Sequence, residues 1–319
     1  MISLLDSHIN LQYPIVTMGT FDGVHLGHQR LLKKVISQAK RMKGESVVIT
    51  YYHHPKEILT DSLSTYLLTE KERKTSILKD LGIDHVVYLN FDQEMAQMKA
   101  EEFLRKILLE KIKMKEIVFG YDCHFGYKRE GDYHFLKNNE KKYGYRAFLI
   151  KPVKIKGKIV SSSLIRNLIR VGEVGEAKKY LGRFYDLKAT VTTGSGIGRK
   201  IGYPTLNLLP TDPYKLLPAN GVYLGRALVN GKKFFCLTNI GYCPTLKELD
   251  EKTVETFLLD FDVQTKIERI NVSFITRLRD EVKFPDKDSL VKAIRRDQQT
   301  AESLIRELRS ESDLDIEVR

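Results

Sequence analysis

The segment Gly19-Thr-Phe-Asp-Gly-Val-His-Leu-Gly-His28 decides how the first half of the chain is expected to fold. It follows the apolar run Pro14–Met18 and opens a stretch, His28 to Lys43, whose apolar residues have helical spacing. A glycine-rich turn between strand and helix lets backbone N–H groups approach a phosphate, and the helix N-terminus adds positive potential. His25 and His28 stand where both imidazoles can donate to phosphate oxygens. We therefore predict a nucleotide-phosphate site; a plain turn with capping histidines is the alternative.

The same alternation of strands and helices continues through the first half. Apolar runs predict strands at 47–51, 86–89, 117–120 and 147–150, and helical spacing predicts helices at about 70–81 and 101–111. Alternating units of this kind predict a parallel, doubly wound α/β sheet of Rossmann-like type, which binds ligands beyond the carboxyl ends of its strands. Two short helices between 160 and 182, ended by Gly172 and Gly182, complete a predicted first domain of residues 1–182.

The second half, residues 183–319, has a different pattern and predicts a second domain. Short β-rich segments occur at 186–193, 222–229, 233–239, 253–261 and 267–275. Asn230-Gly231 between two of them is a strong hairpin signal. The pattern predicts a small antiparallel β-barrel, closed by a C-terminal helix from Asp288 to about Arg309.

Composition narrows the class of protein. The 319 residues are 42% hydrophobic and 29% charged, which favours a folded protein of two domains over a disordered chain. We find no apolar run of the length a membrane helix needs and no signal-peptide pattern, so we expect a cytoplasmic protein without a membrane partner. Cys123, Cys236 and Cys243 form no CxxC, which disfavours a disulfide scaffold or a zinc ribbon. We expect a monomer or a weak oligomer.

The charge is uneven and favours an anionic partner. The net charge is +12, and residues 1–180 hold 31 Lys and Arg against 21 Asp and Glu, or +10. Either nucleotide phosphates or nucleic acid would match this excess. Because the chain has no RNP-type aromatic pair, we expect no nucleic-acid partner, and we keep an RNA-binding regulator as the competing class.

The first-half motif resembles the signature of bacterial bifunctional riboflavin kinase/FAD synthetases, in their FMN adenylyltransferase domain. Three later segments agree, namely TYYHHP at 50–55, VFGYDCHFG at 118–126 and VSSSLIR at 160–166. The sequence departs from the family pattern at Tyr51, His53, Cys123 and Ser163. The resemblance extends from about residue 14 to about residue 309.

The resemblance implies that this domain transfers AMP from ATP to FMN. It implies catalytic roles for His25, His28 and Arg166, and flavin contacts from His54 and Asp122. The implied nucleotide contacts are Gly19, Phe21, Asp22, Gly23, Gly27, Ser162 and Ser163. From spacing alone, Ser162 and Arg166 are four residues apart at a helix start and can clamp phosphates, although a helix cap followed by a surface arginine fits equally well.

The second-half motif, Gly194-Ser-Gly-Ile-Gly-Arg-Lys-Ile-Gly-Tyr-Pro-Thr-Leu-Asn207, resembles the flavokinase signature. The predicted flap over the nucleotide comprises Gly194, Gly196, Gly198, Arg199, Lys200 and Gly202. In a strand, Thr205 and Asn207 point to one face, where their oxygens are suited to Mg²⁺.

A glutamate completes the second predicted site. Alternation places Glu255 on the face of Phe257, Leu259 and Phe261, which we expect to be buried in the barrel. A glutamate on an apolar face is a buried ion-pair partner, the sign of a register break at the strand end, or a general base for a substrate hydroxyl. The resemblance implies that Glu255 is the base and that Arg279 contacts the flavin. Gln264-Thr265 departs from the Tyr-Gly that many members carry there.

The resemblance therefore implies two reactions on one chain. Riboflavin and ATP give FMN in the barrel domain, and FMN and a second ATP give FAD and pyrophosphate in the first domain. ATP is the co-substrate, Mg²⁺ the cofactor, and FMN and FAD serve as product and substrate. Two alternatives stay open: a chain in which the kinase half alone is active, and an RNA-binding protein that senses flavin.

Overall fold

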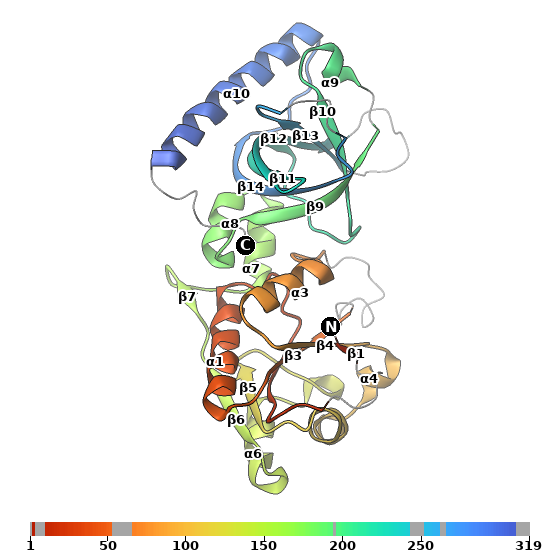
Figure 1. Ribbon diagram of the computed structural model, residues 1–319, viewed down its shortest axis with the longest axis vertical. Coiled ribbons are helices and arrows are strands. Elements are labelled where there is room, and N and C mark those ends of the chain that lie inside the picture. Colours follow the sequence, from red (N-terminus) through yellow and green to blue (C-terminus); the bar gives the residue numbers. More distant parts are fainter. Residues whose placement is uncertain are drawn as a thin grey trace. The chain divides into compact units, whose positions relative to one another are not determined.

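A six-stranded parallel sheet forms the centre of the first half in the computed structural model (Figure 1). Its strand order is β1(Ile2–Ser3), β4(His85–Leu89), β3(Ser46–Tyr51), β2(Ile15–Met18), β5(Glu116–Gly120), β6(Arg146–Ile150). All five predicted strands are present, and β1 is an additional edge strand. The chain runs outward from β2 through β3 and β4, then returns to place β5 on the other side of β2. The order of the strands therefore reverses between the neighbouring strands β2 and β5. Sheets of this type bind ligands at the carboxyl ends of the strands that flank such a switch point.

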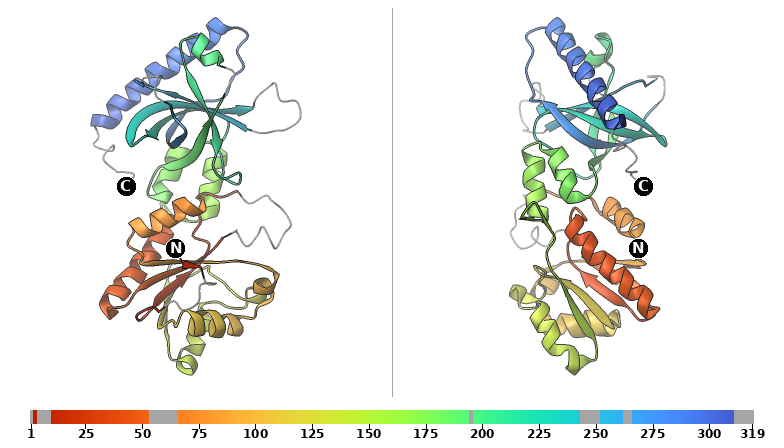
Figure 2. Two further views of the ribbon diagram at one scale, coloured as in Figure 1. Left: turned by 45° about the vertical axis from the view of Figure 1, so that its right-hand side comes forward. Right: turned by 90° about the vertical axis from the view of Figure 1, so that its left-hand side faces the viewer.

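Helices cover both faces of this sheet (Figure 2). On one face, α1(Leu26–Met42) and α3(Lys71–Asp80) pack against residues such as Ile15, Val48 and Val118. On the other face, α5(Ala100–Phe103), the π-helical η1(Leu104–Lys111) and α6(Tyr133–Tyr143) pack against the alternating residues, such as Val16 and Phe119. Burial on both faces explains why the strands are continuous apolar runs.

Several short elements carry no apolar pattern and were not expected. They are α4(Gln93–Gln97), η2(Tyr127–Arg129), α6, β7(Lys154–Ile155) and β8(Lys158–Ile159). Leu136 is the buried residue of α6, so this helix has almost no apolar stripe. Its caps were a usable signal, because Asp132 accepts a hydrogen bond from the Phe135 N–H at one end and Gly144 adopts the left-handed conformation at the other.

The second half contains the predicted antiparallel barrel. Its closed strand order is β10(Thr205–Pro210), β13(Lys252–Leu258), β12(Lys232–Tyr242), β11(Gly221–Val229), β14(Arg269–Arg279), β9(Tyr185–Thr192). The short helix α9(Ile197–Lys200) lies between β9 and β10. The C-terminal α10(Lys287–Ser310) packs on the outside of the barrel through Ala301 and Ile305.

The two connector helices, α7(Ser162–Arg170) and α8(Val174–Leu181), associate with the barrel rather than with the sheet. The contacts divide the chain into Met1–Ser162 and Ser163–Arg319. Ile169 accepts a backbone hydrogen bond from Ala219 through its carbonyl, and Gly172 lies against Tyr223 and Arg277. The sequence grouped these helices with the first domain because apolar spacing does not say which neighbour a helix covers.

The structure describes residues 2–3, 10–52, 66–193, 196–242, 252–261 and 266–310. Within these ranges, none of the helices combines the length and the apolar character needed to span a bilayer.

Candidate active sites

The first candidate site lies at the switch point of the parallel sheet. The loop from Gly19 follows β2, and Asp122 follows β5, the next strand in the sheet. The Cys123 thiol donates a hydrogen bond to the Met18 carbonyl over 3.3 Å, so the two strand ends are in contact. The sheet thus brings together two motifs about a hundred residues apart, at the edge where ligands bind.

The loop after β2 has an unusual backbone that its neighbours stabilise. Phe21, Gly23 and Val24 all have positive φ angles, of 47°, 86° and 38°. For Phe21 and Val24 this conformation is strained. The Asp22 carboxylate, only 2% exposed, accepts hydrogen bonds from the N–H groups of Leu68 and Thr69. Asp22 therefore fixes the loop from within.

The two histidines form a stacked pair at the start of α1. Their rings are 3.6 Å apart at 13°, and His25 caps the helix by accepting the His28 N–H at Nδ1 over 3.3 Å. A neutral imidazole that accepts at Nδ1 carries its proton on Nε2, so His25 presents Nε2–H as a donor. A Cβ on Gly27 would lie 3.0 Å from the His25 ring, which explains a glycine between the histidines.

The serine segment also reaches this loop. Ser162 begins α7, and its hydroxyl donates to the Asp22 carbonyl over 2.8 Å. Ser163 follows it, and Arg166 lies one helical turn further along the same helix. The structure thus brings Ser162 to the loop that holds Gly19, Phe21, Gly23 and the histidines, and Asp122 follows the neighbouring strand. His54 lies outside the described residues.

The second candidate site is a pocket of about 720 Å³ at the β9–β10 end of the barrel. Five predicted residues line it, namely Gly196, Arg199, Gly202, Thr205 and Asn207. The pocket is also lined by Phe257, Leu258, Asp260, Phe261, Lys266 and Ile267. Gly194 and the Lys200 side chain lie outside what the structure describes.

Glu255 lies beside this pocket in a row of polar residues across three strands. In the strand register it faces Asn207 on β10 and Asn239 on β12. The Thr205 hydroxyl donates to Glu255 Oε2 over 3.4 Å. Sequence reasoning assigned Thr205, Asn207 and Glu255 to this site and interpreted the segment from Asn239 to Gly241 as a barrel turn near the flavin, whereas these residues lie within strand β12.

The prediction that Glu255 faces the barrel interior was wrong. Val254, Thr256 and Leu258 are the buried residues of β13, whereas Glu255 and Phe257 are partly exposed. The Thr256 hydroxyl shares a buried 3.0 Å hydrogen bond with Thr238 inside the barrel. Phe257 instead packs against the outer cluster under α10, so Glu255 lies on the outer face. The outer face is apolar because a helix covers it, which alternation cannot distinguish from a barrel interior.

The glycine-rich segment is shaped for close backbone contacts. Gly196 and Gly202 have left-handed φ angles of 70° and 83°. A Cβ on Gly198 would lie 2.4 Å from the Tyr203 carbonyl oxygen, so an alanine there displaces the backbone. The Tyr203 ring packs edge-on against Phe257, which links this segment to β13.

Arg279, predicted to contact the flavin, holds an internal ion pair. Its guanidinium binds Asp297 of α10 through Nε at 2.9 Å and Nη2 at 2.8 Å. This bidentate pair fastens α10 to β14. Close by, Glu281 accepts a hydrogen bond from Asn220 and lies directly over Gly241. Asn220, Gly241 and Glu281, which are distant in the sequence, therefore lie together in the barrel.

Comparison with known proteins identifies the family of both halves of the chain. Residues 8–164 match the family model of FAD synthetase, and residues 181–305 match that of riboflavin kinase. A bifunctional riboflavin kinase/FMN adenylyltransferase of Buchnera aphidicola is 33% identical over 88% of this chain and 91% of its own. The chain belongs to this bifunctional family. The Bacillus subtilis member is 31% identical over 90% of this chain and 91% of its own.

The bifunctional family explains the two-part architecture. The chain is a riboflavin kinase and an FMN adenylyltransferase, converting riboflavin to FMN and FMN to FAD with ATP. The α/β sheet and the closed barrel are the two folds expected of these activities. A solved Streptococcus pneumoniae chain, described as a macrolide-efflux protein, is 28% identical with a TM-score of 0.87, covering 94% of this chain and 98% of that one.

Proposed function

We propose that the barrel pocket is where riboflavin is phosphorylated, with Glu255 as the general base. Glu255 takes the proton of the riboflavin 5′-hydroxyl as its oxygen bonds to the γ-phosphorus of ATP, and the bond to the ADP oxygen breaks. The observation that carries this assignment is the cross-strand pairing of Glu255 with Asn207, a residue that lines the pocket. The segment from Gly196 to Gly202, with Arg199, covers the phosphates.

Thr205 and Asn207 are proposed to hold Mg²⁺. Both residues line the pocket, and their hydroxyl and amide oxygens are hard donors of the kind Mg²⁺ prefers. When bound, the ion neutralises charge on the ATP phosphates. The partly exposed Asn207 and Thr205 side chains leave room for water and phosphate oxygens to complete an octahedral shell.

In the sheet domain, we assign adenylyl transfer to the loop after β2. An FMN phosphate oxygen bonds to the α-phosphorus of ATP, and pyrophosphate leaves. A phosphate nucleophile needs no base, so the chain positions the reactants and stabilises charge through His25, His28, Ser162, Ser163 and Arg166. Asp122 and His54 are proposed to contact the flavin. Glycines 19, 23 and 27 let the backbone approach the nucleotide.

Three further points belong to the same proposal. The functional boundary lies near residues 182 and 183, since the kinase family model begins at residue 181. The location is cytoplasmic, which the use of ATP supports. The chain is proposed to work as a monomer or a weak oligomer.

The metal assignment is tested by separating the two reactions. The full chain is supplied with riboflavin and ATP, or with FMN and ATP, over a Mg²⁺ series, and FMN and FAD are separated by chromatography. Asn207→Ala is expected to raise the Mg²⁺ concentration for half-maximal FMN formation by tenfold or more, because a ligand is lost. FAD formation from FMN keeps its Mg²⁺ dependence. An unchanged Mg²⁺ requirement for the kinase reaction contradicts the assignment.

A further inference from the structure

Lys74 is a buried cation that the proposed reactions leave without a role. It lies on α3 with 8% of its surface exposed. Its ammonium donates hydrogen bonds to the Thr20 carbonyl at 3.0 Å and to the Thr50 hydroxyl at 3.4 Å. The Thr50 hydroxyl itself donates to the same Thr20 carbonyl over 3.1 Å. Two donors from two different elements therefore hold one carbonyl of the loop after β2.

The surroundings of Lys74 keep its charge weakly compensated. Burial lowers its pKa to about 8, the Asp22 carboxylate raises the pKa, and the neighbouring Lys71 lowers it further. The Tyr88 ring of β4 faces the ammonium at 5.7 Å. Lys74 forms no ion pair with any carboxylate in the described part of the chain. A buried ammonium bound to neutral oxygens keeps a positive potential at the loop that it supports.

The geometry of the peptide unit links Lys74 to the nucleotide loop. In a trans peptide, the carbonyl and the following N–H point in opposite directions. Because the Thr20 carbonyl points toward Lys74 and Thr50, the Phe21 N–H points away from α3. That N–H donates to none of the described residues, while the Phe21 side chain is buried. With a φ of 47° at Phe21, this peptide is not in its relaxed orientation.

We propose that Lys74 is a positioning residue for adenylyl transfer: it holds the Thr20 peptide so that the Phe21 N–H donates to a phosphate of the bound nucleotide. Its charge adds to the positive potential that attracts that phosphate. The proposal rests on the assignment of adenylyl transfer to this loop. It makes α3, an element without any of the recognised motifs, part of the support of the active site.

The test compares Lys74→Met and Lys74→Arg in the full chain, with Lys79→Met in the last turn of α3 as the matched control. FAD formation from FMN is measured against ATP concentration, and FMN formation from riboflavin reports the other domain. We expect Lys74→Met to lower kcat/KM for ATP in FAD formation by tenfold or more. FMN formation, and both reactions of Lys79→Met, are expected to stay within twofold of wild type.

The pH profile supplies a readout that a purely structural role does not move. Lys74 is charged below about pH 8 and loses its charge above it. FAD formation by the wild type is therefore expected to fall as the pH rises through 8, and Lys74→Arg, whose guanidinium stays charged, is expected to lack this decline. If FAD formation by the wild type and by Lys74→Arg declines equally above pH 8, the proposal is overturned. This comparison does not depend on whether Lys74→Met folds.

Two outcomes separate this proposal from the one on which it rests. Full FAD formation by a folded Lys74→Met protein overturns the role of Lys74, while loss of activity in His28→Ala leaves the assignment of the loop intact. Conversely, if His28→Ala forms FAD at the wild-type rate, the site assignment itself fails. Equal losses of FMN and FAD formation in Lys74→Met would show a general folding defect and count against a specific role.

Discussion

Asn207 of β10 and Glu255 of β13 are direct partners in the strand register of the barrel, although 48 positions separate them in the sequence. Asn239 of β12 is the register partner on the other side of Glu255. Glu255, the proposed base, therefore lies between the side-chain amides of Asn207 and Asn239 on the outer face, and Asn207 lines the barrel pocket. Closure of the barrel, rather than any local motif, places the base next to the proposed metal ligand.

Glu255→Gln is expected to lower FMN formation by about two to four orders of magnitude, because the substitution removes the basic oxygen but keeps the shape. FAD formation from supplied FMN should persist. Since Glu255 is partly exposed, the free energy of unfolding should change by less than about 0.5 kcal/mol. The measurement is FMN production by chromatography, together with thermal unfolding.

The matched control for this variant is Glu302→Gln, which neutralises an exposed carboxylate on α10 that accepts a hydrogen bond from Gln298. It should leave both activities unchanged. Kinase turnover retained in a folded Glu255→Gln protein would exclude Glu255 as the base. Asp260, which lines the pocket, would then be the carboxylate to test.

His28→Ala is expected to abolish FAD formation while FMN formation continues. Loss of one preorganised donor at a phosphate of increasing charge costs about 3 kcal/mol, or a hundredfold and more in rate. The control is His134→Ala, which removes an exposed imidazole from α6. Equal damage to the two reactions would show that the stacking of His25 and His28 matters for folding rather than for chemistry.

Gly198→Ala is expected to impair the kinase reaction through the backbone. The new Cβ would meet the Tyr203 carbonyl at 2.4 Å, so the glycine-rich segment must shift away from Thr205. We expect kcat/KM for ATP in FMN formation to fall tenfold or more, which is about 1.4 kcal/mol. Gly175→Ala in α8, whose Cβ would make an ordinary 3.4 Å contact, is the control. Equal kinase activity in the two variants would contradict a role for this close approach.

The barrel should work without the sheet domain. We expect residues 183–319 and residues 163–319, each expressed alone, to form FMN but no FAD. The longer fragment keeps α7 and α8, whose buried Val174 and Leu181 are each worth about 1.5–3 kcal/mol. Its melting temperature should therefore be higher by more than about 5 °C. An insoluble or inactive longer fragment would show that the kinase depends on the first unit.

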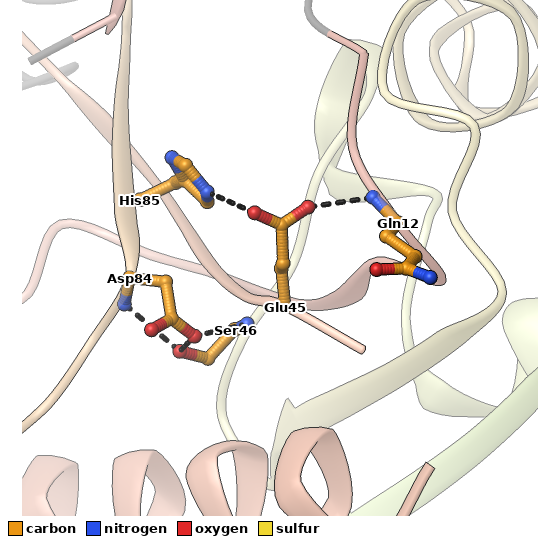
Figure 3. Close-up of polar contacts among 5 residues, drawn as sticks. All are labelled: Gln12, Glu45, Ser46, Asp84 and His85. Atoms are coloured by element: carbon orange, nitrogen blue, oxygen red, sulfur yellow. Dashed lines mark hydrogen bonds and ion pairs between the residues drawn. The ribbon is translucent and has the colours of Figure 1, made fainter. Parts of the chain in front are cut away.

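A polar cluster at the amino ends of β3 and β4, the edge of the sheet opposite the loop after β2, predicts an effect of pH on stability alone (Figure 3). Glu45 accepts hydrogen bonds from His85 at 2.8 Å and from the Gln12 N–H at 2.6 Å. Burial raises the Glu45 pKa, but the bonds from His85 and Gln12 outweigh it and hold the pKa below its ordinary 4.5.

A carboxyl with a lowered pKa in the folded state stabilises the protein above pH 4.5, and this contribution is lost as the pH falls through the folded-state pKa. Glu45→Gln should therefore destabilise the protein at pH 7 by less than about 1 kcal/mol and match the wild type at strongly acid pH. Urea unfolding at several pH values measures this. A difference from wild type that grows toward acid pH would contradict the sign.

Local sequence patterns were sufficient for the elements that carry chemistry. The strand, turn and helix around GTFDGVHLGH depend on short-range apolar spacing and appear as predicted, and His25 caps the helix as the alternative interpretation of this turn expected. The same holds for the hairpin at Asn230-Gly231 and for the shared face of Thr205 and Asn207, because strand alternation is a local property. The sequence by itself therefore determined the two folds, and the residues that it proposes for both sites stay predictions.

Tertiary structure decided what those residues face. Asp22 is turned toward the N–H groups of Leu68 and Thr69, and Arg279 is bound by Asp297, partners that no spacing rule links to them. Glu255 lies on the outer face of the barrel, and that face is also apolar because α10 covers it. Alternation therefore separates the two faces of a strand but does not tell which face is inside the barrel. Long-range packing selects partners by burial and charge across the fold, and that selection has no signature within a single stretch of chain.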